Sequence, residues 1–517
     1  MSSRKKEEVF QLVKSLEKGE KRNFKLFVKR NSANSDLKII QLFDILDKMN
    51  VYNEGILLKQ NKNLKKQQLS NLKAHLYKQI LASLRVMSDS DDIENMLHEE
   101  IKNARILYRK GLYLQSLRIL QRTKQIALAY HQGTFLLQIL IFEKKIESLH
   151  ITRSLDNRAE ELSEKIAYHT QQLKNISAIS NFALQLYGKY ISNGHARNPE
   201  EVRVFKDFFF SHIPADSHLE KSFYGRLYLF QAHVWYGFIL QDVLQYYRYA
   251  QKWVSLFEEE SQMVPLEINY LLKGYHHLLQ ALFMLRHADK FRMGIERFQV
   301  FLEKNGRRFN ENGSIQAFIY LELAHIDLHF LEGTFTKGWE IIPRIEVKMA
   351  QFQQRMDDHY RLTFYYKIAC LYFGGGDNEK AIQYLSKIIH SKWHLREDLQ
   401  CYARLLHLIA HFELGHFDIM DSLIKSVYRF MAKMQNLSAV EEEIFGFLRQ
   451  SLHLYPQDLN QAFEDLLHKL QQLENIPGER RAFMYLDFIS WLQSKLQDVP
   501  VEDIIRKRYL QRLGEGE

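Results

Sequence analysis

The chain has 517 residues, and 46% of them are hydrophobic, which is enough to build a buried core and excludes a wholly disordered protein. Only 7 prolines and 22 glycines occur, and this scarcity favours a mostly helical fold. The formal net charge of +9 comes from residues 1–90, where 19 Lys and Arg face 9 Asp and Glu, a balance of +10, so the remaining residues sum to −1. A nucleic-acid partner is therefore a hypothesis for the first 90 residues only.

Two features of the sequence bear on location. The first ten residues, MSSRKKEEVF, have no apolar segment behind their charges, so we expect no secretory signal. No run of about 18 apolar residues occurs, so we expect no membrane span and a cytoplasmic protein.

The two cysteines, Cys370 and Cys401, lie in apolar helical patterns, and we expect both to be buried thiols.

Apolar spacing in residues 1–90 predicts a basic helical module. Two short helices are expected within residues 6–30, a third over 36–49 and a longer one over 64–87. The acidic, polar stretch SDSDDIEN then interrupts the pattern, and we place a domain boundary near residue 90.

From residue 91 to 456, helix pairs separated by glycine turns recur. A unit over residues 98–130 has Gly111 in its turn, and later units have Gly333, Gly376 and Gly415, spaced by 43 and 39 residues. Residues 134–170 and 173–212 are predicted to be helix pairs without this signature. Residues 457–517 are expected to form two or three helices that cap the array.

The clearest unit is TFYYKIACLYFGGGDNEKAIQYLSKIIH, residues 363–390. Small residues near Ala369 and Ala381 allow its two helices to approach closely, and the stretch resembles a tetratricopeptide repeat, although that family repeats about every 34 residues. The resemblance implies an all-α protein, an α-solenoid of antiparallel helix hairpins. It also implies a scaffold that binds a protein or peptide, and not an enzyme.

In such repeats the first helix of each hairpin lines a concave groove. With the turn glycines as register, the groove-facing residues form an aromatic stripe: Tyr320, Leu323, Phe330, Tyr366, Phe373, Tyr402, Leu405, Ile409 and Phe412. One groove type of this family clamps a terminal carboxylate with Lys and Asn side chains. Only Lys367 matches a cation of that clamp, so the resemblance implies an apolar groove, either open to a peptide or filled by the protein itself or a second copy.

Two histidine pairs have the i, i+4 spacing of metal ligands: His325 with His329, and His407 with His411. Neither first histidine is followed by the glutamate of a zinc-protease helix. Counted from the turn glycines, both pairs occupy a position that apolar residues fill in the unit between them. We therefore predict that these histidines pack and hydrogen-bond locally, and we predict no metal site.

No motif points to catalysis or to a cofactor. FGGGDN, residues 373–378, lacks the Lys-Ser/Thr of a phosphate loop and is followed by acidic residues, so it is interpreted as a turn. No nucleophile elbow, CxxC pair, dinucleotide fingerprint or calcium loop occurs.

A second hypothesis is a nucleic-acid-binding regulator with a ligand-sensing repeat array, an arrangement that resembles certain bacterial regulators in architecture only. Its phosphate contacts would come from Lys62, Lys65, Lys66, Lys73, Lys78 and Arg85. These residues do not form one helical face, because Lys73 falls within the apolar arc. A third class is structural self-assembly, and the sequence does not determine the oligomeric state.

Overall fold

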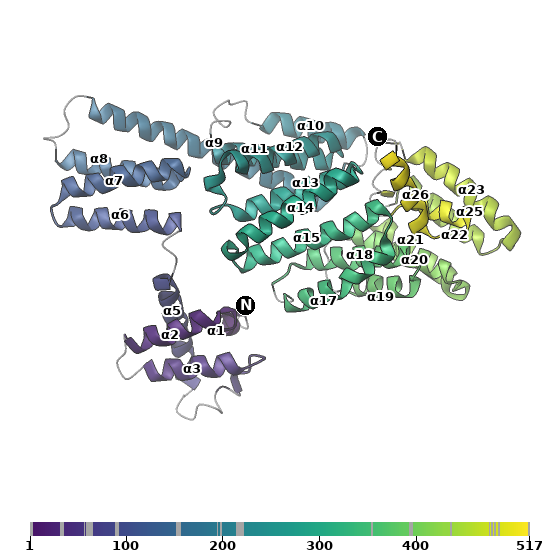
Figure 1. Cartoon of the computed structure of the whole chain (residues 1–517), viewed down its shortest axis with the longest axis horizontal. Coiled ribbons are helices and arrows are strands. Elements are labelled where there is room, and N and C mark those ends of the chain that lie inside the picture. The colour runs from purple at the N-terminus through teal and green to yellow at the C-terminus, as the bar shows by residue number, and fades with distance from the viewer. Residues whose placement is uncertain are drawn as a thin grey trace. The chain divides into compact units, whose positions relative to one another are not determined.

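The computed structural model describes residues 4–30, 36–55, 57, 66–87, 92–150, 157–193, 195–196, 199–213, 222–352, 355–391, 396–434, 437–474, 476, 479, 482–483 and 486–514. Every regular element of these residues is a helix, which confirms the all-α prediction (Figure 1). None of these helices combines the length and the apolar character that crossing a membrane requires. The chain divides into two compact units, residues 1–119 and 120–517, and each is described by itself below.

The first unit has a hydrophobic core of its own. The core is built from four helices, α1 (Arg4–Ser15), α2 (Lys18–Arg30), α3 (Asp36–Lys48) and α5 (Lys66–Met87). Phe24 and Phe43 are fully buried at its centre, with ring centroids 4.7 Å apart. The helices predicted from the spacing of apolar residues are thus confirmed, whereas the domain boundary near residue 90 stays a prediction.

The hairpin predicted over residues 98–130 is present. Helix α6 (Ile93–Arg109) is joined to α7 (Tyr113–Ala129) by a turn in which Gly111 has a φ of +78°. Ser116 Oγ donates a hydrogen bond to the carbonyl of the buried Ala104, at 2.8 Å. Small side chains at both positions allow the two helix backbones to approach this closely.

The second unit continues with helices that pack on their neighbours in sequence, and from residue 179 onward most of their buried apolar side chains form one large hydrophobic core. Its longer helices are α8 (Gly133–Leu149), α9 (Arg158–Asn193), α10 (Pro199–His212), α11 (Phe223–Ile239), α12 (Val243–Glu259), α13 (Ile268–Met284), α14 (Ala288–Asn305), α15 (Glu311–Glu332), α17 (Ile342–Gln351), α18 (Asp358–Gly374), α19 (Asn378–Ile389), α20 (Glu397–Glu413), α21 (Phe417–Lys433), α22 (Ala439–Ser451), α23 (Pro456–Leu473), α25 (Phe488–Gln497) and α26 (Val501–Gly514).

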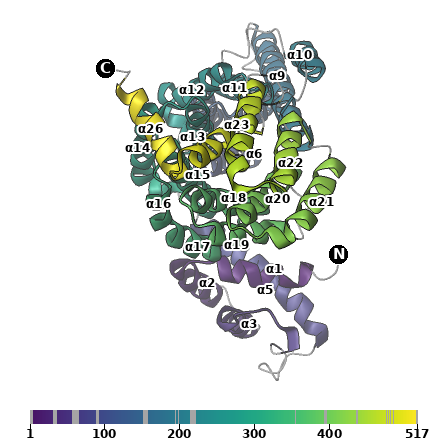
Figure 2. The same cartoon turned by 90° about the vertical axis from the view of Figure 1, so that its right-hand side faces the viewer.

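The order of contacts shows how these helices are layered. Helices α13, α15, α18 and α20 contact one another in succession, and Figure 2 shows them on the inner side of an arc. Helices α14, α17, α19 and α21 lie outside them in the same view. Each of α12, α14 and α19 also packs on the helix that follows it, so consecutive hairpins share an interface.

Glycine and proline set the turns where the sequence predicts them. Gly333, Gly376 and Gly415 all have positive φ, at +60°, +89° and +71°, a region that side chains with a Cβ rarely adopt. Pro343 stands at the start of α17, where its missing N–H costs no helical hydrogen bond. The predicted glycine turns of the later hairpins are therefore confirmed.

One part of the predicted organisation is wrong. Residues 134–170 and 173–212 are not two helix pairs, because α9 runs unbroken for 36 residues from Arg158 to Asn193. Gly188 lies within this helix and does not end it, because its φ is not positive and the helix continues to Asn193. Helix α9 packs on α8 with its first part and on α11 beyond it.

Candidate functional site

The predicted aromatic stripe lies mostly inside the protein. Eight of its nine residues are no more than 7% exposed, and the ninth, Phe330, is half-buried. The stripe residues of α20 pack in the core. The Tyr402 hydroxyl donates to Glu441 of α22 at 2.7 Å, and the Phe412 ring lies 5.9 Å from that of Phe447. This end of the stripe therefore joins neighbouring helices.

The other end of the stripe borders a cavity of about 1200 Å³. Phe330 of α15 and Tyr366 and Phe373 of α18 line it. Further apolar wall comes from Phe283 at the end of α13. Three of the nine predicted residues thus lie together on one open space, whereas binding of a partner by all nine stays a prediction.

Another part of the cavity wall comes from the end of the chain. Val501, Ile505, Tyr509 and Leu513 of α26 line it, together with residues of the segment before α25. Helix α26 contacts α15, although about 170 residues separate them in the sequence. No feature of the sequence pattern indicated these lining residues, because a helical wheel does not tell which distant segment covers a face.

Backbone contact at Gly333 holds α26 in place. A Cβ on Gly333 would lie 2.3 Å from the Arg506 nitrogen, so the absence of a side chain permits this approach. The Glu502 carboxylate accepts hydrogen bonds from the Thr336 amide at 3.0 Å and from its hydroxyl at 2.9 Å. Arg506 Nη1 donates to the Glu332 carbonyl at 3.1 Å, which satisfies one of the carbonyls that the end of α15 leaves open.

An ion pair between the half-buried Lys367 and the buried Asp327 forms part of the cavity wall. Lys367 of α18 bonds Asp327 of α15, and both line the space. Burial raises the pKa of the Asp327 carboxyl, although the nearby Lys367 ammonium opposes the shift. The Lys367 ammonium also lies 5.4 Å from the Phe283 ring centroid and 5.7 Å from that of Phe330, which is cation–π distance.

Two further polar groups line the cavity, the thiol of Cys370 and the side-chain amide of Gln241. Burial raises the pKa of the Cys370 thiol to about 12, so this cysteine is protonated at neutral pH and is a poor nucleophile. The Gln241 side chain also lines the space, and its Nε2 is buried without a hydrogen-bond partner among the described residues. A buried amide donor of this kind is stabilised when an acceptor reaches it.

Charged side chains surround the cavity with a small positive excess. Six Lys and Arg line it against four Asp and Glu, so the lining carries two net positive charges. Arg286 and Lys290 are exposed beside the start of α14, and Arg508 and Arg512 stand on α26. Cationic groups of two elements that are distant in the sequence therefore line the same cavity.

The histidine pairs make local contacts, as predicted. His325 Nε2 lies 3.0 Å from Gln299 Nε2, and His329 Nδ1 lies 2.8 Å from the Thr334 hydroxyl. The rings of His407 and His411 are 4.5 Å apart, edge to face. Within the described ranges, no group of three His, Cys, Asp or Glu side chains is arranged to hold a metal ion.

The basic residues singled out in the first unit differ in setting. Lys62 and Lys65 lie outside the described residues, and Lys66 begins α5. Lys73 is half-buried, bonds the Tyr52 hydroxyl and lies 3.7 Å from Glu54. Lys78 and Arg85 are exposed on α5.

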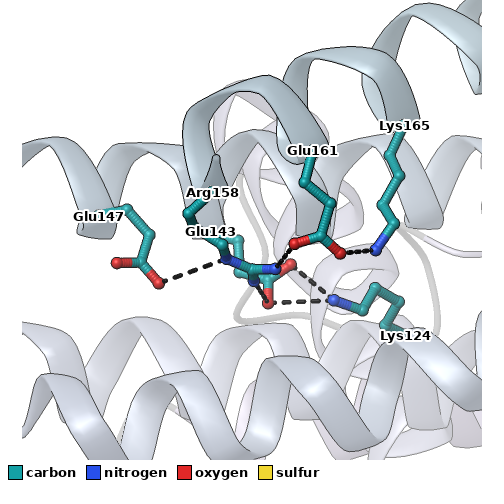
Figure 3. A network of polar contacts seen from close by, with 6 residues as sticks. All are labelled: Lys124, Glu143, Glu147, Arg158, Glu161 and Lys165. Carbon is teal, nitrogen blue, oxygen red and sulfur yellow. Dashed lines mark hydrogen bonds and ion pairs between the residues drawn. The ribbon is translucent and has the colours of Figure 1, made fainter. Parts of the chain in front are cut away.

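A separate network of charged side chains joins α7, α8 and α9 (Figure 3). The carboxylate of Glu143 on α8 is 4% exposed and accepts from Lys124 of α7 at 2.8 Å and from Arg158 of α9 at 3.4 Å. Arg158 also bonds Glu161 at 2.6 Å, and Glu161 bonds Lys165. Lys165 and Arg158 together lower the pKa of Glu161 to about 2. All these groups have partners, so the network acts as a structural tie between three helices.

Comparison with protein-family models and with curated proteins finds no match for this chain. The geometry of the cavity therefore carries the functional conclusion.

Proposed function

We propose that this protein is a non-enzymatic scaffold that binds a segment of a partner protein or a peptide. In this proposal the helix pairs form a tetratricopeptide-like solenoid, and the partner segment lies in the cavity between α13, α15 and α18 on one side and α26 on the other. The observation that supports it is a space of about 1200 Å³ with aromatic walls, at the inner side of successive hairpins.

The chemistry of the lining favours a peptide occupant. Small-molecule sites are typically about 300–1000 Å³, and this space of about 1200 Å³ is larger than that range. Phe330 and Tyr366 provide apolar surface for side chains, and the buried Gln241 amide offers a donor for a peptide carbonyl. The protonated Cys370 and the paired Lys367 and Asp327 offer no activated nucleophile, which supports binding over catalysis.

Filling the cavity tests this proposal. Thr363 lines the space from α18, and its hydroxyl donates to the His359 carbonyl at 2.9 Å. Thr170 on α9 makes the same i−4 bond, to Ile166 at 2.7 Å, and is exposed outside the cavity. Thr363→Trp should therefore block the space, and Thr170→Trp provides a matched control.

The measurement is binding of the labelled full chain to an array of randomised dodecapeptides. We expect the wild type and Thr170→Trp to bind the same subset, and Thr363→Trp to lose at least about tenfold in affinity for it. If the wild type binds no peptide, or if Thr363→Trp binds as the wild type does, the proposal is wrong.

A second candidate is a nucleic-acid-binding regulator that uses residues 1–90. It is favoured by the balance of +10 in this segment and by the exposure of Lys78 and Arg85 on one helix. The internal bonds of Lys73 count against its use as a phosphate contact. A gel shift of the full chain with DNA and RNA, at low and high salt, tests it, because Lys78→Glu with Arg85→Glu should abolish any retardation.

A further inference from the structure

The inner sides of α13, α15 and α18 are joined by two sets of contacts, one above the other along the helices. The lower set borders the cavity: Lys367 joins Asp327 and lies over the rings of Phe283 and Phe330. In the upper set, the His276 ring of α13 stacks on Tyr320 of α15 at 4.3 Å between centroids. The Tyr320 hydroxyl is 3.3 Å from that of Tyr360 on α18. We call these two sets, with Lys273 one turn before His276, the inner strip.

Lys273 is the unusual member of the inner strip. Its ammonium lies over two aromatic rings, 5.2 Å from the centroid of Tyr187 and 5.6 Å from that of Trp235. Within the described ranges no carboxylate lies within ion-pair distance of it, whereas Lys367 has Asp327. Burial lowers the pKa of the Lys273 ammonium, and no acidic group opposes that shift. Aromatic rings compensate only part of the cost of burying a charge.

Ring contacts link the surroundings of Lys273 to the wall of the cavity. Tyr190 of α9 lines the cavity and stacks on Trp235 at 5.6 Å between centroids, and Trp235 is the ring beneath Lys273. On α13, Gln280 and Phe283 line the cavity seven and ten residues after Lys273. At 1.5 Å per residue, Lys273 therefore stands roughly 11–15 Å from the cavity wall along the helix.

We propose that Lys273 receives an acidic side chain, Asp or Glu, of an extended peptide whose apolar residue occupies the cavity. This inference rests on the proposed function. A carboxylate would supply the negative charge that the Lys273 ammonium lacks as a partner. Their interaction would be stronger than in water, because the surroundings are partly buried. Because an extended chain advances about 3.3 Å per residue, the acidic residue lies three to five positions from the apolar residue.

Two variants isolate the charge. Lys273→Met removes the ammonium and keeps an unbranched side chain of similar length. Lys290→Met removes an exposed cation at the edge of the cavity and is the control. Thermal unfolding followed by circular dichroism should show that Lys273→Met is as stable as the wild type or more stable, since the lost charge has no internal carboxylate and its two ring contacts offset only part of the cost of burial. A melting temperature several degrees lower would reveal a structural partner and overturn the proposal.

The binding test uses array peptides in pairs that differ only by Glu or Gln at one position. We expect the wild type and Lys290→Met to bind the Glu peptides at least tenfold more tightly, with the preference greatest three to five residues from an aromatic residue. Lys273→Met should bind the two members of each pair within twofold. A Glu preference that survives in Lys273→Met, or its absence in the wild type, overturns the role of Lys273.

Further arms of the same array separate the alternatives. If C-terminal amidation abolishes binding of the Glu and Gln members of each pair alike, the recognised group is the terminal carboxylate, and the side-chain assignment is wrong. Peptides that Thr363→Trp fails to bind, but that show no difference between Glu and Gln, would leave the proposed function intact and remove Lys273 from it. No binding by any peptide would remove both.

Discussion

Replacing Gly333 by alanine should detach α26 from α15. Gly333 ends α15 with a φ of +60°, and an added Cβ would lie 2.3 Å from the Arg506 nitrogen and 2.8 Å from both Arg506 Cα and the Glu502 carbonyl oxygen. These are backbone atoms, so no side-chain rotation relieves the overlap. Helix α26 would have to move by about 1 Å before the contact becomes an ordinary van der Waals distance.

The expected magnitude has two parts. A left-handed conformation costs alanine about 1–2 kcal/mol relative to glycine. Moving α26 would also weaken three hydrogen bonds, the two that Glu502 accepts from Thr336 and the one that Arg506 donates to Glu332. At about 0.5–1.5 kcal/mol each, these add roughly 2–4 kcal/mol. The free energy of unfolding should therefore fall by about 3–6 kcal/mol.

Gly376 provides the matched control. Its φ is +89°, and a Cβ there would meet nothing within 4 Å, so Gly376→Ala carries the conformational cost without the clash. We expect urea unfolding to show a loss of about 1–2 kcal/mol for this variant. Hydrogen exchange over residues 501–514 should accelerate in Gly333→Ala and stay at the wild-type rate in Gly376→Ala. Equal losses of stability, with protection of residues 501–514 unchanged in both variants, would refute the reasoning.

Three further perturbations test other contacts. Glu143→Gln should cost about 1–3 kcal/mol in urea unfolding because it leaves Lys124 without its buried carboxylate, whereas the exposed Glu164→Gln should change stability by less than about 0.5 kcal/mol. Asp327→Asn should cost a similar amount, and adding Lys367→Met should recover most of it, as a double-mutant cycle would show. Acidification should destabilise the fold, because burial lowers the pKa of four histidines to about 3 or 4 while the unfolded chain takes up those protons near pH 6.5. The free energy of unfolding begins to fall as the pH drops below about 6.5, and the loss reaches roughly 2 kcal/mol per histidine at pH 5. It continues to grow until the pH reaches the pKa of the histidine in the folded protein. Equal urea midpoints at pH 8 and pH 5 would contradict this prediction. These histidines are His233, His276, His359 and His407.

Local chemistry made much of the fold predictable. Gly333, Gly376 and Gly415 were expected in turns because glycine between two periodic segments commonly ends a helix, and all three have a positive φ, which glycine adopts at little cost. The positions of Ala369 and Ala381 predicted close helix packing, and both are fully buried. Such residues act through their own backbone or their nearest helix, so the sequence around them contains the necessary information.

Prediction failed where the deciding contact is distant or where a signal is missing. The 36 residues of α9 contain no proline, and Gly188 does not interrupt the helix, so periodicity alone gave no reason to choose one long helix over two pairs. Lys273 was overlooked because its importance depends on Tyr187 and Trp235, which belong to two other helices. An uncompensated buried charge can be recognised only when all its neighbours are known.

Distant contacts also decide which residues of the aromatic stripe are covered by other helices and which line the cavity. A helical wheel identifies an apolar face, but an apolar face is required both by a groove and by a helix–helix interface. On α20, contacts of Tyr402 and Phe412 with α22 cover that face, and Glu413 is bonded by Trp491 of α25 at 2.7 Å. On α15 the neighbouring element is α26, which approaches the backbone closely at Gly333 and lines the cavity together with residues of α15 and α18. The share of the inner face that stays open is therefore set by the last segment of the chain, so a change that moves α26 should alter binding in the cavity without any substitution in its aromatic wall.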